Sequence, residues 1–222
     1  HGIEVLCTLL AYKLKHRNRI HLLRGHSECR DWAKKFGFHD ECIRKYDGHH
    51  IWQLFIELFP CFPLAAVISG EIFAVHSGLS IKLPTLDSIR QIDRFNCSLV
   101  EVSSPISDLL MCTPADDITG YSTRHHTQPM QFGPDVTSDF LKNNGLKTLI
   151  RSSKVVEEGC ARNHDGVVWT VFSAPNYCGR CKNKGAVLEI TDSGEISSIE
   201  IDEVAKREGS PQLVSRMPGL DG

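Results

Sequence analysis

The stretch that decides the fold runs from Arg19 to Tyr46 and reads RIHLLRGHSECRDWAKKFGFHDECIRKY. It begins with a short apolar run that breaks at Gly25 and continues into polar residues. Such a pattern is typical of a buried strand whose C-terminal end carries functional groups. In open α/β folds, ligands bind at that edge of the sheet. We therefore expect a strand over 19–23, a functional edge from Gly25 onward, and a helix that ends near Tyr46.

Two more helices are predicted on either side of this stretch. Residues 1–15 place one apolar face at helical spacing, and residues 49–59 do the same before Pro60 and Pro63 end the helix. Residues 64–68 and 71–75 are β-prone runs joined by Ser69-Gly70, which predicts a buried hairpin.

The remaining chain predicts a helix over 85–94, mostly loop over 95–131, and a helix from Phe132 through Phe140. Four β-prone runs then alternate with turns at 148–151, 167–172, 186–190 and 196–201, and we expect them to form a second sheet. Residues 1–203 are predicted to be the folded domain, with 204–222 as a flexible C-terminal tail.

Composition limits the class of protein. The 222 residues suffice for one α/β domain, and the formal net charge of -2 offers no basic face for nucleic acid or membrane surfaces. The 9 cysteines are odd in number and scattered, which favours a reducing compartment. We find no secretory signal, membrane-spanning stretch or lipidation motif, so the cytoplasm or nucleus is the expected location.

Several separate motifs, in order along the chain, resemble those of the protein serine/threonine phosphatases of the metallophosphoesterase (PPP) class, most closely the type-1 branch. Residues 23–28, LRGHSE, resemble the family's Leu-Arg-Gly-Asn-His-Glu. Residues 76–80 resemble His-Gly-Gly-Leu-Ser, and 151–157 resemble Arg-Ala-His-Gln-Val-Val-Glu. Residues 172–179, FSAPNYCG, match a family signature without a change.

The resemblance implies a calcineurin-like metallophosphoesterase fold, a β-sandwich flanked by helices. Two further family motifs, Gly-Asp-x-His-Gly and Gly-Asp-x-Val-Asp-Arg-Gly, would lie before His1. We therefore expect the chain to lack the family's N-terminal strands and the metal and phosphate ligands that these two motifs carry.

The family's chemistry uses two divalent metals (Mn, Fe or Zn), about 3.5–4 Å apart in such centres, to activate water and spread charge from the phosphoryl oxygens. His26 stands where the family has a metal-binding Asn, and an imidazole binds these metals well. A hydrogen-bonded loop histidine is the equal alternative for His26. His76 keeps a family metal-ligand position, with a satisfied core histidine as its alternative.

Ser153 takes the place of the family's last histidine ligand, and Lys154 beside it adds positive charge where cations should lie. A neutral serine is a poor ligand for these metals. We therefore expect the second metal site to be lost, and one metal or none to bind.

The family's general acid is a histidine, and an ungapped comparison places Ser27 there. An alcohol hardly ionises near neutral pH and cannot deliver that proton. A slip of one residue would make His26 the acid instead, but Arg24, Gly25 and Glu28 hold the ungapped register.

Three more residues fall at or near the family's phosphate site. His126 stands in register with a phosphate-binding arginine, and Arg124 lies two residues away. Tyr177 keeps the position of a tyrosine that borders the bound phosphate, although it can also be an aromatic packing residue on a turn.

Two other groupings favour structural interpretations. Cys178 and Cys181 could be drawn as a zinc site with His125, His126 or His164, but one cysteine pair without a second is a weak signal. Asp40 and Glu41 could form an acid/base pair, yet in the family they support the helix and its neighbouring loop.

Three functions compete. The chain is an active phosphatase that depends on upstream residues, a non-catalytic pseudophosphatase that acts as a protein-binding or regulatory module, or a truncated product with little stability of its own. The apolar pattern is retained while the substitutions fall on site residues. We therefore expect a phosphatase-like domain that is inactive or strongly impaired. Its expected partners are a phosphoprotein substrate or regulatory protein subunits.

Overall fold

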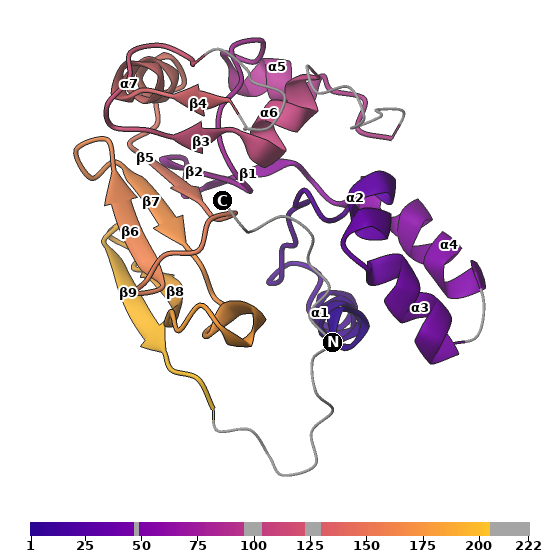
Figure 1. Ribbon diagram of the computed structural model, residues 1–222. Helices are drawn as coiled ribbons and strands as arrows, with labels where there is room; N and C mark the ends of the chain where they lie inside the picture. Colours follow the sequence, from indigo (N-terminus) through magenta and orange to yellow (C-terminus); the bar gives the residue numbers. More distant parts are fainter. Residues whose placement is uncertain (47–48, 96–103, 123–129, 205–222) are drawn as a thin grey trace.

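The structure is a computed structural model that describes residues 1–46, 49–95, 104–122 and 130–204 (Figure 1). Helices from the first part of the chain lie beside a mixed sheet built from its middle and later parts (Figure 1). The expectations for residues 205–222 of the tail, and for Arg124 and His126, lie outside the described residues.

The N-terminal helices share a core of their own. They are α1 (Gly2–Lys15), α2 (Arg30–Lys35), α3 (Phe38–Tyr46), α4 (His49–Leu58) and the 3-10 turn η1 (Phe59–Cys61). Their buried side chains are mostly aromatic or aliphatic: Ile3, Ala33, Cys42, Trp52, Phe55, Phe59 and Phe62. The helix predicted to end near Tyr46 is divided in two at Gly37, where φ is +85° and a left-handed backbone ends the first part.

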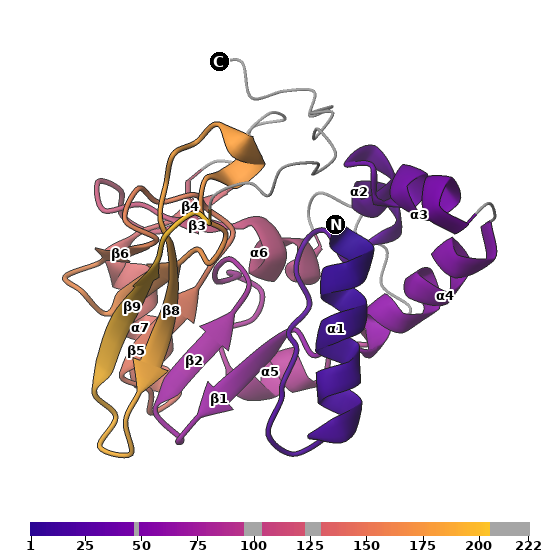
Figure 2. The same cartoon turned by 90° about the horizontal axis from the view of Figure 1, so that it is seen from below.

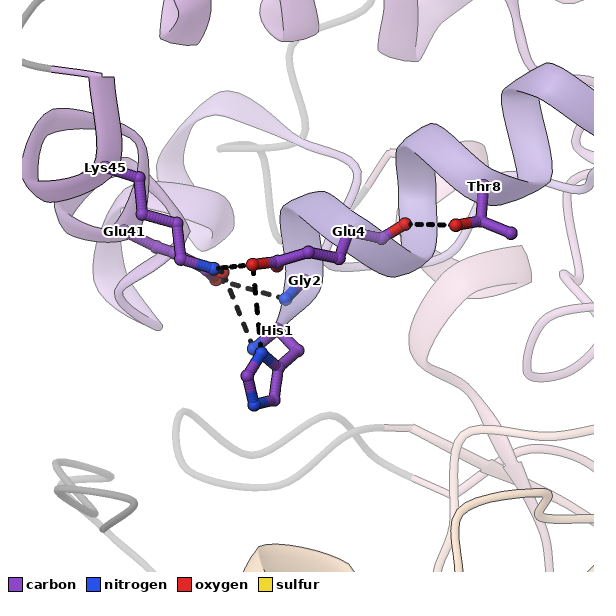
Figure 3. Close-up of polar contacts among 6 residues, drawn as sticks. All are labelled: His1, Gly2, Glu4, Thr8, Glu41 and Lys45. Atoms are coloured by element: carbon purple, nitrogen blue, oxygen red, sulfur yellow. Dashed lines mark hydrogen bonds and ion pairs between the residues drawn. The ribbon is translucent and has the colours of Figure 1, made fainter. Parts of the chain in front are cut away.

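A polar cluster joins α1 to α3 (Figure 3). The carboxylate of Glu41 accepts the backbone N–H of Gly2 at 3.2 Å and the ammonium of Lys45 at 2.7 Å. Lys45 also contacts Glu4 at 2.5 Å, and the Thr8 hydroxyl donates to the Glu4 carbonyl oxygen at 2.7 Å. Glu41 therefore has the structural role expected for it.

The main sheet has five strands in the order β1-β2-β5-β7-β6. The hairpin of β1 (Ala65–Ile68) and β2 (Ile72–Val75) turns at Ser69 and Gly70, which both have positive φ, as expected of a tight turn. Strands β2, β5 (Thr148–Arg151) and β7 (Val168–Val171) are parallel, whereas β6 (Cys160–Asn163) is antiparallel to β7.

The other elements surround this sheet. They are α5 (Leu86–Arg90), α6 (Pro105–Met111), β3 (Thr113–Pro114), β4 (Gln131–Phe132), α7 (Pro134–Asn143), η2 (Tyr177–Gly179), β8 (Gly185–Ile190) and β9 (Ile196–Ile201). Helix α7 packs against β5, while β8 pairs with β9 and contacts β6 and β7. Figure 2 shows β8 and β9 in front of β5 and α7. The predicted α/β fold class, with sheets flanked by helices, is confirmed.

Several sequence predictions were wrong in detail. Residues 19–23 form no strand, because no neighbouring strand among the described residues pairs with them. The N–H groups of Arg19 and Ile20 donate to His16 O at 2.9 and 3.0 Å, and the N–H of the next residue after the segment, Arg24, donates to Pro63 O at 2.8 Å. Of the four β-prone runs predicted to form a second sheet, β5 and β7 join the first sheet, and β8 and β9 pair with each other in a sheet of their own. Strand β6 was not predicted.

The predicted loop over 95–131 contains a buried helix, α6. Ser104 caps it by accepting the backbone N–H of Ser107, and Pro105 occupies its first turn. The serine and proline that suggested a loop are therefore helix-start signals. No helix among the described residues is long and apolar enough to cross a membrane.

Candidate active site

The candidate site forms where the carboxyl ends of β2 and β5 meet. His76 directly follows β2, and Arg151 is the last residue of β5. The backbone N–H of Ser152 donates to the His76 carbonyl oxygen at 2.9 Å, which fastens the two strand ends together. The loop from Gly25 to Glu28, just before α2, lies at the same edge. Side-chain atoms of Glu28 and His76 are so close to Gly25 that a Cβ there would contact both.

Two predicted metal ligands, His26 and His76, contact each other directly. His26 Nδ1 lies 2.8 Å from His76 Nε2, and His26 Nε2 lies 3.5 Å from the Ser27 hydroxyl oxygen. Burial lowers the pKa of His26. Burial also lowers the pKa of His76 to about 3, and repulsion from the Arg151 cation and from a protonated His26 acts in the same direction. Both imidazoles are therefore neutral near pH 7.

Gly25 allows this close approach. A Cβ at that position would lie 2.6 Å from Glu28 Oε2 and 3.0 Å from His76 Cε1, so only glycine fits without a shift of its neighbours. The Gly25 N–H donates to the same Glu28 oxygen at 2.8 Å. Burial raises the pKa of Glu28, and the hydrogen bond from Gly25 opposes that rise.

Aromatic rings border His26 on the helix side. Trp32 lies on α2, and Phe36 directly follows that helix. Their rings stack on each other with centroids 5.1 Å apart. Both meet the His26 ring edge to face, with centroids 5.7 and 6.5 Å away. These contacts fix the plane of the imidazole.

Arg151 is a site residue that the sequence did not single out. It is 1 % exposed, and its Nε and Nη2 donate to the carbonyl oxygen and hydroxyl of Ser77 at 2.7 and 3.0 Å. The Ser77 hydroxyl in turn donates to Cys112 O at 2.8 Å. Arg151 therefore holds the residue after His76 against the end of α6. An arginine that ends a β-prone run was the available signal.

The guanidinium of Arg151 is not fully used. Its Nη1 is buried and has no hydrogen-bond partner among the described residues. Burial lowers the pKa of Arg151 to about 10, so the group stays charged at pH 7. A buried cation with a free donor is costly unless another group satisfies it.

Ser153 lies two residues after the end of β5, at the position predicted to replace a family histidine ligand. Its φ of +68° places it in the left-handed region, which is uncommon for a residue with a side chain. The backbone conformation is thus specialised although the side chain is a poor metal ligand.

Tyr177 lies in a turn that polar side chains hold in place. Asn176 and Cys178 beside it have φ of +43° and +57°. The amide oxygen of Asn183 accepts the Tyr177 N–H at 2.9 Å, while its amide nitrogen donates to Ala174 O at 2.9 Å. The Tyr177 ring packs edge to face on Phe172 with centroids 5.1 Å apart, as its packing alternative predicts.

His164 is removed from the possible zinc ligands. Its Nδ1 lies 2.7 Å from the Thr137 hydroxyl and its Nε2 lies 3.1 Å from Ala115 O, so both ring nitrogens are already used. His125 and His126 lie outside the described residues. His164 is therefore a satisfied core histidine.

The described residues do not fit a two-metal centre. Two nitrogens bound at 2.0–2.1 Å to one tetrahedral metal stand about 3.4 Å apart, whereas those of His26 and His76 are 2.8 Å apart and face each other. Over the described ranges, no three His, Cys, Asp or Glu residues gather in a way that could hold a metal. The pair could supply two nitrogens to one metal only after separating.

Two comparisons bear on this geometry. Residues 2–152 match the family of calcineurin-like phosphoesterases. The fold is also similar to a solved protein serine/threonine phosphatase from Saccharomyces cerevisiae, described as similar to human phosphatase PP5. The two chains are 30% identical with a TM-score of 0.83, and the match covers 93% of this chain and 67% of the yeast chain.

Proposed function

This chain belongs to the calcineurin-like phosphoesterase family, and we propose that it is a PPP-type serine/threonine phosphatase domain whose own hydrolysis of phosphoserine and phosphothreonine is absent or strongly impaired. The family generally binds divalent metals, which would activate water and stabilise charge on the phosphoryl oxygens. The observation that carries the proposal is the direct contact of His26 with His76, 2.8 Å apart. Two nitrogens that share a hydrogen bond must separate before both can bind a metal.

The residue at the general-acid position also supports impairment. Ser27 is exposed, and its one hydrogen-bond contact within the described part of the chain is the long 3.5 Å approach to His26 Nε2. Loss of general-acid help typically costs 10²–10⁴-fold in rate, or about 3–5 kcal/mol in barrier height. Ser153 in place of a histidine ligand would add to that loss.

A non-catalytic role as a binding or regulatory module is the form of this proposal that the packing favours. The groups that shape the edge of the sheet keep their structural contacts. Arg151 donates to the Ser77 carbonyl oxygen, and Gly25 leaves room for the His76 ring. Substitutions that replace catalytic and metal-binding residues but keep these contacts are compatible with selection for a binding surface. The partners we propose are a phosphoprotein or a regulatory protein subunit.

Metal content by elemental analysis of the purified, folded chain tests the proposal, together with turnover of an aryl phosphate in added Mn²⁺. We expect less than one metal per chain and no turnover, with cooperative unfolding intact. Two metals per chain with hydrolysis would contradict the proposal.

Any weak turnover can be assigned with two matched variants. His76→Ala should abolish hydrolysis that belongs to this site, whereas His50→Ala, at an exposed histidine of α4, should leave it unchanged. Turnover that survives His76→Ala would point to a contaminating phosphatase.

A further inference from the structure

The turn that follows β7 carries two cysteines that the proposed phosphatase function does not use. Cys178 and Cys181 are separated by Gly179 and Arg180, in the sequence CGRC. Both are free thiols, and Cys181 is exposed whereas Cys178 is partly buried. One cysteine pair supplies only two of the four ligands of a structural zinc site. Cys-x-x-Cys spacing is instead typical of pairs that interconvert between dithiol and disulfide.

The backbone of this turn brings the two cysteines to one place. The N–H groups of Arg180 and Cys181 both donate to the Tyr177 carbonyl oxygen, at 3.3 and 3.1 Å. Positive φ at Cys178 and Gly179, +57° and +70°, turns the chain sharply between donors and acceptor. In a tight turn, the Cα atoms of residues three apart lie within about 7 Å of each other. A disulfide spans about 4.4–6.8 Å between Cα atoms, so this backbone admits one with little movement.

The two side chains also gather at one group, the hydroxyl of Tyr177. Burial raises the pKa of Tyr177, and negative charge on Cys178 and on Cys181 raises it further. A charge shifts the pKa of another group appreciably only from nearby. The sulfurs of both cysteines therefore lie near the same phenol oxygen, as the shape of the turn leads one to expect.

Asn176 and Asn183 close the turn on either side of the cysteines. The Asn176 N–H donates to the Asn183 carbonyl oxygen at 2.7 Å, and the Asn176 side-chain oxygen accepts the Lys182 N–H at 3.1 Å. Asn183 is buried, and its side chain also donates to Lys184 O at 2.8 Å. None of these bonds uses a sulfur atom, so the thiols can react without breaking the contacts that shape the turn.

Cationic side chains flank the pair. Arg180 lies between the cysteines and Lys182 directly follows them, and both are exposed. Reactive cysteines typically occupy electropositive and partly exposed surroundings. Positive charge also attracts small anionic reagents such as glutathione. Because Cys181 is the more exposed thiol, it is the one that such a reagent reaches first.

We propose that Cys178 and Cys181 are a reversible dithiol/disulfide pair that exchanges with small anionic disulfides of the glutathione type. The Cys181 thiolate attacks one sulfur of the small disulfide, whose S–S bond breaks, and one thiolate leaves with the bonding electrons. The Cys178 thiolate then attacks the Cys181 sulfur in the mixed disulfide and expels the second thiolate. The protein loses two electrons and two protons, and the small disulfide gains them as two thiols. Such an exchange is compatible with the reducing compartment that the cysteine pattern favours.

The test equilibrates the full chain, without oxygen and with EDTA, in buffers of increasing ratio of oxidised to reduced glutathione. Acid quenching, alkylation of the remaining thiols and peptide mass spectrometry then locate each modification. We expect a Cys178–Cys181 bridge at lower ratios than any glutathione adduct at the exposed single thiols Cys7 and Cys61, because closing the bridge is an intramolecular step. Excess reduced glutathione should reopen it.

Three outcomes would overturn the proposal. They are adducts at Cys7 and Cys61 before any bridge forms, a bridge from either cysteine of the turn to a different cysteine, and a bridge that excess reduced glutathione does not reopen.

Variants separate the attacking thiol from the resolving thiol. Cys178→Ser should trap a mixed disulfide at Cys181, and Cys178→Ala serves if the serine variant fails to fold. Cys181→Ser should slow the reaction of the turn with oxidised glutathione at least about tenfold, because Cys178 is less accessible. Cys61→Ser, at an exposed single thiol, should leave the rate and yield of the bridge unchanged. Equal rates in folded Cys178→Ser and Cys181→Ser chains would disprove the order of attack.

Discussion

Two polar clusters in this molecule are built on opposite plans. The cluster between α1 and α3 pairs the carboxylates of Glu4 and Glu41 with Lys45, so each charge meets an opposite charge (Figure 3). The cluster at the strand ends combines two neutral imidazoles with the buried cation of Arg151, whose Nη1 lacks a partner among the described residues. The first cluster satisfies itself. The second cluster keeps a buried donor, Arg151 Nη1, that the described residues do not satisfy, as is typical of a functional site.

The largest expected effect comes from removing the buried cation. Arg151→Met keeps most of the side-chain volume but deletes the two charged hydrogen bonds to Ser77. Bonds of this kind contribute about 1.5–3 kcal/mol each, partly offset here by relief of the buried charge. We expect the free energy of unfolding to fall by about 3 kcal/mol in urea titrations.

A matched arginine provides the control for that change. Arg162→Met on β6 removes only a cation–π contact, with the guanidinium 3.8 Å from the Trp169 ring centroid, on an exposed side chain. It should cost less than about 1 kcal/mol. If Arg151→Met costs no more than Arg162→Met, Arg151 does not organise the strand ends.

The next largest effect is the part of the pH dependence of the free energy of unfolding that comes from His76. Its folded pKa of about 3 lies below the ordinary value of 6.5, so the unfolded chain binds a proton that the folded chain refuses. Stability is therefore complete above pH 6.5 and is lost as the pH falls toward 3. We expect His76→Gln to remove up to about 3 kcal/mol of the loss between pH 7 and pH 4. An unchanged slope in unfolding titrations over this range would contradict the shift.

The smallest effect contrasts one glutamate from each cluster. Burial raises the pKa of Glu41, but Lys45 and the backbone of Gly2 outweigh it, so its net pKa is lowered. Its stabilisation is present above the unfolded pKa near 4.5 and is lost as the pH falls through the folded pKa. Glu41→Gln should cost about 1 kcal/mol at pH 7 and little at pH 3.

Glu28 should behave with the opposite sign. Its pKa is raised by burial, so its contribution is most favourable below the unfolded pKa and declines as the pH rises through the folded one. Glu28→Gln should therefore gain stability relative to wild type as the pH rises from 4 to 7. The same sign of pH dependence for both variants would show that the two clusters do not differ as described.

The sequence predicted the elements whose signal is local. The 3.6-residue period of residues 49–58 and the Ser69-Gly70 turn each depend on short-range geometry, and both appear in the structure. The strand predicted over 19–23 does not form, because a strand needs a hydrogen-bonded neighbour and the sequence of one segment does not show whether it has one. Helix α6 was missed because its Ser104-Pro105 cap has the composition of a loop.

The candidate site was predictable in its parts but not in its assembly. His26 and His76 were identified separately, from motifs 50 residues apart. The hydrogen-bond contact between their rings depends on the space that Gly25 leaves. Arg151 was overlooked because its importance comes from burial against Ser77, a property of tertiary packing. Residue type and spacing indicate which groups reach an edge, whereas packing decides which groups touch.

The edge contact between Trp32 and His26 also makes the molecule its own spectroscopic probe. The chain has three tryptophans, and the other two report on different places, Trp52 in the helical core and Trp169 on β7. With Trp52 and Trp169 changed to phenylalanine, the remaining tryptophan fluorescence would come from Trp32, whose ring contacts the imidazole of His26. Anything that binds, alkylates or displaces His26 would then be visible as a change in emission, without a label.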